Sequence, residues 1–208
     1  MSGTITALVV QKNNKERVNV YLDDEFAFGV TLSAALTLKK GQELTDAEIT
    51  QLKADDTVDK AYDQSLRYLS FRPRTIQEVR QYLQKKGISD ENTEFVIERL
   101  TNQGYLNDAE FGRVWVNDRE RLNPKGKRAL QYELRQKGLS EKDIQQALDD
   151  LDEEALAWQA VEKQIRRWQN LDETAFRQKL AGYLARRGFD YDIIQLIFDK
   201  AWAEQRRD

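Results

Sequence analysis

The chain has 208 residues, 40 % hydrophobic and 33 % charged, so it is long enough for one or two domains and richer in charge than an average globular protein. Its net charge of −3 excludes a strongly basic protein that coats nucleic acid, although not a local basic face. The absence of cysteine and histidine excludes disulfides, thiolate metal sites and a Ser-His-Asp triad. No apolar run is long enough to span a bilayer. We therefore expect a cytoplasmic protein that is not an enzyme and uses no cofactor or metal.

Residues 1–57 are expected to form a small β-containing module. Between Thr4 and about Val30 apolar and polar residues alternate, with Ile5, Ala7 and Val9 expected on one face, which predicts three short strands in a meander. The strands are separated by turn residues at 13–15 and 23–25. A meander of this size needs a helix to cover one face. Two helices are expected after it, at Leu32–Leu38 and Asp46–Lys53.

From about residue 58 onward the pattern is helical and occurs three times. Gly87, Gly138 and Gly188 lie 51 and 50 residues apart, and each has a leucine four positions before it and an apolar residue directly after it. Such a glycine ends one helix in the left-handed conformation, and the Ser or Asp two positions later caps the next helix. With one more helix before each pair, the sequence predicts three-helix repeats at residues 58–106, 107–153 and 154–208.

The expected fold class is mainly α: tandem three-helix, helix-turn-helix-like repeats in an elongated array behind the β-containing module. The first helices of the repeats are expected at Asp59–Phe71, Asp108–Leu122 and Glu154–Gln169. The middle helices are expected at Arg74–Lys86, Lys125–Lys137 and Glu173–Arg187. The last helices are expected at Asp90–Thr101, Glu141–Glu154 and Asp190–Glu204.

The array is expected to be an elongated monomer in solution, because each repeat buries little alone and gains from stacking on its neighbours. A compact globule of this length has a radius of gyration of about 17 Å. Small-angle scattering should give a clearly larger radius. The compact value would rule out the extended array, although not the helical repeats.

Charge separates by helix within each repeat. The last helices are acidic, which argues against reading of DNA bases by a helix-turn-helix, because phosphates would repel them. The middle helices and the turns before them are basic, and they supply the candidate contacts to DNA or to a protein partner. These candidates are Arg72, Arg74, Arg80, Lys85 and Lys86 in the first repeat and Lys125, Lys127, Arg128, Arg135 and Lys137 in the second.

Two interpretations of these charges compete. Cations at helix C-termini and carboxylates at N-termini follow the helix dipole, and neighbouring basic and acidic helices can pair with each other. The dipole does not explain Lys125, Lys127 and Arg128, which lie at the expected start of their helix, where cations are disfavoured. This turn is therefore a candidate anion-facing surface, for DNA phosphate or for carboxylates of a partner. Reversing its three charges is expected to leave the fold intact.

Two other features favour structural interpretations. The acidic run 149–154 lacks the spaced loop of a calcium site and is typical of a solvated junction between helices. The four tryptophans could stack on bases, but Trp158 and Trp168 lie at helical spacing with Val161 and Ile165, which favours core packing.

Residues 66–75, Leu-Arg-Tyr-Leu-Ser-Phe-Arg-Pro-Arg-Thr, and their continuation to Lys85-Lys86-Gly87 resemble the signature of the RecX family, the regulatory proteins of the RecA recombinase. Residues 100–106 and 111–119 fit the family as well, and residues 22–30 resemble the N-terminal extension that many members carry.

The resemblance implies a negative regulator of RecA. Such a protein binds the RecA filament on single-stranded DNA, lodges in its groove, and opposes ATP hydrolysis and strand exchange during DNA repair and recombination. Direct binding to single-stranded DNA is expected to be weak, and no membrane partner is expected. The alternatives are a stand-alone DNA-binding helical repeat protein and a general helical adaptor.

Overall fold

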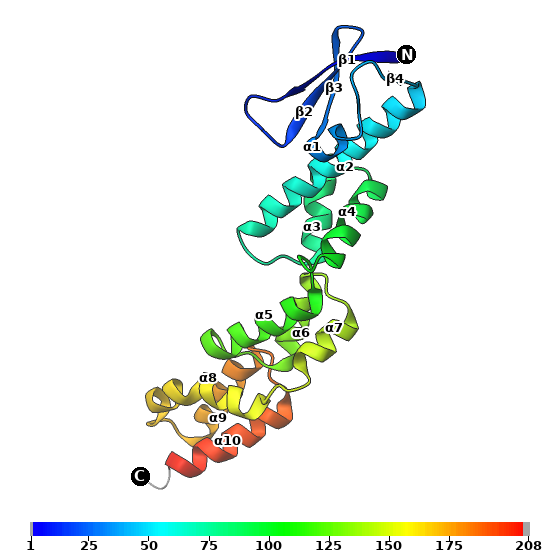
Figure 1. Ribbon diagram of the computed structural model, residues 1–208. Helices are drawn as coiled ribbons and strands as arrows, with labels where there is room; N and C mark the ends of the chain where they lie inside the picture. The colour runs from blue at the N-terminus through cyan, green and yellow to red at the C-terminus, as the bar shows by residue number, and fades with distance from the viewer. Residues whose placement is uncertain (1, 206–208) are drawn as a thin grey trace. The chain divides into compact units, whose positions relative to one another are not determined.

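A computed structural model describes residues 2–205 of the chain, which is mostly helical with a small sheet at the N-terminal end (Figure 1). Two compact units are present: Met1–Arg72 with Val79–Tyr105, and Pro73–Glu78 with Leu106–Asp208. In the described residues no helix is long and apolar enough to cross a membrane.

The elements of the first unit are β1 (Gly3–Val10), β2 (Arg17–Leu22), β3 (Glu25–Thr31), α1 (Leu32–Ala35), β4 (Glu43–Leu44), α2 (Asp46–Ser70), most of α3 (Ile76–Lys85) and α4 (Asp90–Asn102). The second unit holds the start of α3, then α5 (Asp108–Leu122), α6 (Lys127–Gln136), α7 (Glu141–Leu148), α8 (Glu153–Trp168), α9 (Glu173–Ala185) and α10 (Tyr191–Gln205).

The three predicted strands are confirmed within an antiparallel sheet of order β3-β2-β1-β4. Asp23 and Asp24 have φ of 50° and 70°, as a two-residue hairpin loop requires. The register of β1 shifts between Ile5 and Ala7, so that the expected alternation fails beyond this bulge. Leu8 packs against the core and Val9 is 47 % exposed. The fourth strand, two residues long, is too short to show alternation in the sequence.

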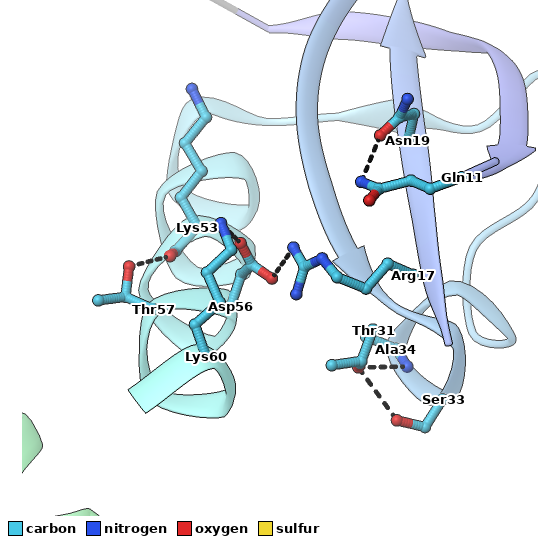
Figure 2. A network of polar contacts seen from close by, with 10 residues as sticks. All are labelled: Gln11, Arg17, Asn19, Thr31, Ser33, Ala34, Lys53, Asp56, Thr57 and Lys60. Carbon is cyan, nitrogen blue, oxygen red and sulfur yellow. Dashed lines mark hydrogen bonds and ion pairs between the residues drawn. The ribbon is translucent and has the colours of Figure 1, made fainter. Parts of the chain in front are cut away.

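The two helices expected at 46–53 and 59–71 form one continuous helix, α2. Its first half packs under the sheet and its second half lies against α4. Asp56 lies in the middle and accepts from Arg17 of β2 at 2.6 Å and pairs with Lys60 at 2.7 Å (Figure 2). These contacts stabilise helix across residues 54–58, where the sequence prediction left a gap between two helices. The expected limit at residue 57 falls inside α2, and the four domain ranges stay a prediction.

The three-helix repeats are confirmed by the glycine turns and by the core. Gly87, Gly138 and Gly188 have φ of 77°, 84° and 82°. The apolar residues four and eight positions before each glycine are fully buried, at 0 % exposure: Leu83, Val79, Leu134, Leu130, Leu184 and Leu180. Ser89 and Ser140 cap α4 and α7 as expected, each accepting from the third backbone amide of its helix. The second and third repeats each have a buried cluster of their own.

Several helix limits differ from the sequence prediction, among them the start of α3 at Ile76 rather than at 74 and the end of α9 at Ala185 rather than at 187. Helix α1 stops at Ala35 rather than at 38, and α6 begins at Lys127 rather than at 125. Helix α7 stops at Leu148 rather than at 154. Asp152 accepts a hydrogen bond from the Ala155 amide at 3.0 Å and caps the next helix, α8. The acidic run is thus a junction between two helices, as the sequence analysis favoured.

In the second unit, the start of one middle helix contacts the glycine turn of the following repeat. The Thr75 hydroxyl donates to the carbonyl oxygen of Lys137 at 2.7 Å, and the Gly126 amide donates to that of Arg187 at 2.9 Å. Thr75 and Gly126 both lie twelve positions before the glycine of their own repeat. The same joint therefore occurs twice.

Candidate interaction surface

The candidate residues of the first unit lie in and around α3. Arg80 donates from Nε and Nη2 to the Glu94 carboxylate of α4, at 2.6 and 2.9 Å, and this hydrogen bonding lowers the pKa of Glu94. Lys85 and Lys86 are exposed at the C-terminal end of α3, where the helix dipole favours cations. The ammonium of Lys86 lies 5.8 Å from the ring centroid of Tyr82. Arg72 is exposed in the turn before α3.

The candidate residues of the second unit are arranged around α6, with Arg74 half-buried two positions before α3 begins. Arg135 lies 2.6 Å from Glu141 and lowers its pKa by hydrogen bonding. Lys137 lies 2.9 Å from Glu78, and Arg128 lies 3.5 Å from Asp190. Pairing between neighbouring basic and acidic segments, one of the two interpretations of the sequence, is thus observed for several candidates.

Glu133 is the one carboxylate on α6, and it collects three donors. Trp115 Nε1 and Arg119 Nε of α5 each lie 2.8 Å from its Oε2, and Lys125 pairs with its other oxygen. Burial alone would raise the pKa of Glu133, but the hydrogen bonds from Lys125, Arg119 and Trp115 outweigh it and hold that pKa below its usual range. The side chain of Glu133 is 17 % exposed.

Lys125 therefore differs from the sequence-based expectation. It precedes α6 instead of beginning it, and its charge faces Glu133. Reversing it to Glu would place two carboxylates together in a largely enclosed site, so the fold is no longer expected to tolerate that change. The sequence signal for this site is Glu133 itself, because it is the single acidic residue within a basic helix.

The N-termini of α3 and α6 already receive anions from within the chain. The Ile76 amide donates to Asp108 at 2.9 Å, and the Lys127 amide donates to Glu153 at 2.7 Å. Asp108 and Glu153 begin the first helices of the following repeats, α5 and α8. A carboxylate at a helix N-terminus is stabilising, and it offsets the cations that begin α6. Sequence spacing gave no sign of these partners, because packing of separate helices brings them together.

The tryptophans mainly complete the cores. Trp158, Trp168 and Trp202 pack against the core of the third repeat, and Trp115 packs against that of the second. In the part of the chain that the structure describes, no group of three or more carboxylates is placed to hold a metal ion. These features define a protein of tandem three-helix repeats with charged surfaces.

The matches to known families cover both the sheet and the repeats. Residues 3–45 match the Regulatory protein RecX N-terminal domain. Residues 61–100, 107–148 and 152–198 match the first, second and third three-helix domains of RecX. The chain belongs to the RecX family of regulatory proteins.

Two relatives and two solved structures show the extent of the likeness. The regulatory protein RecX of Bacillus pumilus (strain SAFR-032) is 37 % identical, with 98 % of this chain and 80 % of that protein covered. That of Bacillus subtilis (strain 168) is 36 % identical, with 98 % and 79 % covered. A crystal structure of regulatory protein RecX matches with a TM-score of 0.82 and 31 % identity over 95 % of this chain and 99 % of the other. RecX from Lactobacillus salivarius matches with a TM-score of 0.67 and 25 % identity, over 71 % and 97 %.

Proposed function

We propose that this protein is a negative regulator of the RecA recombinase that binds the filament of RecA on single-stranded DNA and slows its ATP hydrolysis and strand exchange. The observation that carries the proposal is the match to all four RecX domains in their order along the chain. The protein acts by binding, as a monomer in the cytoplasm, and catalyses no reaction.

The geometry narrows the ten candidate contacts. Lys125 and Lys137 are each 25 % exposed and pair with carboxylates that are 17 % exposed, so exchange of these partners for a filament would disturb the fold. The exposed cations can exchange their partners for a filament at little cost to the fold, because water already screens their ion pairs. The proposed contacts are therefore Arg72, Lys85, Lys86, Arg128 and Arg135. Several weak contacts on one chain can together give strong binding.

Binding to RecA-coated single-stranded DNA should be tighter than binding to the same DNA without RecA. Neutralising Lys85→Gln with Lys86→Gln should weaken binding to the coated DNA, because two exposed cations facing an anionic filament are lost. Fluorescence anisotropy of a labelled strand across salt concentrations measures both differences in affinity, the one between coated and bare DNA and the one between the variant and the unaltered protein. The matched control is Lys39→Gln with Lys40→Gln, an exposed lysine pair in the same unit.

The alternative function, a stand-alone DNA-binding repeat protein, predicts a different result. Tight binding to bare single-stranded DNA, steeply weakened by salt and not improved by RecA, would support it and contradict the proposal.

A further inference from the structure

A groove of about 480 Å³ lies in the third repeat, beside the end of α8 and along one face of α9. This volume lies within the range of pockets that hold small ligands. Its lining residues are Trp168, Ala175, Gln178, Lys179, Gly182 and Arg186. Ala175 and Gly182 lie seven positions apart and so share a face of α9, where their small size leaves space. Among the described residues, a Cβ added at Gly182 would meet only Nη1 of Arg186, at 3.3 Å. The floor of the groove is thus open.

One wall of the groove is a fixed aromatic ring. Trp168 is half-buried, and its indole makes edge contacts with the rings of Phe176 and Tyr183, with centroids 6.2 and 5.7 Å apart and interplanar angles of 77° in both. These contacts hold the indole in place while it lines the groove. Core packing and ligand contact are therefore compatible for this tryptophan.

Two cations flank this wall. Lys179 and Arg186 are exposed, and they lie seven residues, or two turns, apart along the helical segment that faces the groove. Neither makes an ion pair within residues 2–205. This differs from Arg80 and Arg135 on the middle helices of the other repeats, which are paired with Glu94 and Glu141. Among the described residues, no carboxylate lies within ion-pair distance of either cation on this groove.

We propose that this groove binds one nucleotide unit of single-stranded DNA, with the base against the Trp168 indole and the flanking phosphates at Lys179 and Arg186. Stacking on an aromatic side chain beside cations that follow the backbone is how proteins hold single strands without sequence preference. An acidic peptide would use the two cations but would leave the open space beside the indole unexplained. The site goes beyond the proposed function, because it needs no recombinase.

The test measures binding of a labelled oligothymidylate and of an abasic strand of equal length by fluorescence anisotropy, with no RecA present. The unaltered protein should bind the thymidylate at least about fivefold more tightly, the lower limit for stacking of one base. Gly182→Leu fills the floor and should abolish this preference while leaving both cations. Lys179→Glu with Arg186→Glu should weaken binding of both strands and reduce the salt slope by about 1.4, for two phosphate contacts.

The matched control is the reversal of Lys12 and Lys15 to Glu, two exposed lysines in the β1–β2 loop. It changes the net charge by the same amount as the Lys179 and Arg186 variant and should leave the thymidylate preference intact. Circular dichroism checks that each variant folds. Equal binding of the two strands by the unaltered protein would overturn the stacking contact, and full binding by the Lys179 and Arg186 variant would overturn the site. Binding of polyglutamate, but not of thymidylate, with sensitivity to the same substitutions would instead assign the groove to an acidic protein segment.

Discussion

Gly188→Ala is expected to lower the free energy of unfolding by about 3 kcal/mol, with two separate causes. The φ of Gly188 is 82°, and a residue with a Cβ in that conformation costs about 1–2 kcal/mol. The added Cβ would also lie 2.4 Å from Cβ and 2.5 Å from the backbone nitrogen of Ala129, at the start of α6. Overpacking of this kind costs about 1–3 kcal/mol, because backbone must move.

Gly87→Ala separates the two causes. Gly87 has a φ of 77°, but no described atom would lie within 4 Å of an added Cβ. Only the backbone strain remains, so about 1 kcal/mol is expected. Gly126→Ala gives the converse case: its φ of −74° suits any residue, but the Cβ would lie 2.4 Å from the Gly188 carbonyl oxygen.

Urea unfolding followed by circular dichroism measures these costs, and tryptophan fluorescence reports the second unit, which contains all four tryptophans. Equal losses for Gly87→Ala and Gly188→Ala would show that contact between repeats adds nothing to the cost of the turn. A neutral Gly126→Ala would contradict the joint between α6 and the following glycine turn.

Glu133→Gln is expected to destabilise the protein by about 2 kcal/mol at pH 7, because Arg119 and Lys125 lose a charged acceptor in a largely enclosed site. The pKa of Glu133 is lower in the folded protein than its usual value. The stabilisation is therefore complete above the unfolded pKa of about 4.3 and is lost as the pH falls through the folded pKa. The two proteins should thus become more alike in stability below about pH 4.

Chemical unfolding of both proteins between pH 7 and pH 3 tests this dependence. Glu141→Gln is the control, because Glu141 pairs with Arg135 at a site where its side chain is 70 % exposed, and little change is expected. A difference between Glu133→Gln and the unaltered protein that stays constant over this range would show that the ion pairs are not its origin.

The elements found from sequence are those with local signals. The glycine turns depend on one residue's conformation, and the caps at Ser89 and Ser140 depend on a side chain reaching an amide three positions away. The contacts missed from sequence are long-range. Glu153 lies 26 residues from the amide that it accepts from, and no spacing rule connects them. The β1 bulge and the continuous α2 were missed for the same reason, since pairing with other segments determines both.

The candidate surface shows the same division. Of the candidate basic residues that the sequence placed on the middle helices, five lie on α3 or α6: Arg80, Lys85, Lys127, Arg128 and Arg135. The others flank these helices: Arg74, Lys86, Lys125 and Lys137. The sequence could not tell which of these residues face carboxylates within the chain. Lys125 was selected for its place in the loop before α6. The carboxylate that it pairs with, Glu133, lies about two helical turns into α6. For Lys179 and Arg186 the absence of an ion pair among the described residues is what makes them notable, and only the packed chain shows it.

The most direct measurement is the ATPase rate of RecA from the same cell on single-stranded DNA while this protein is titrated in. The proposed function predicts slowing at amounts of the protein well below those of RecA, because one chain bridging neighbouring filament subunits would hinder more than one of them. An ATPase rate that does not change, even when the protein equals RecA in amount, would contradict it.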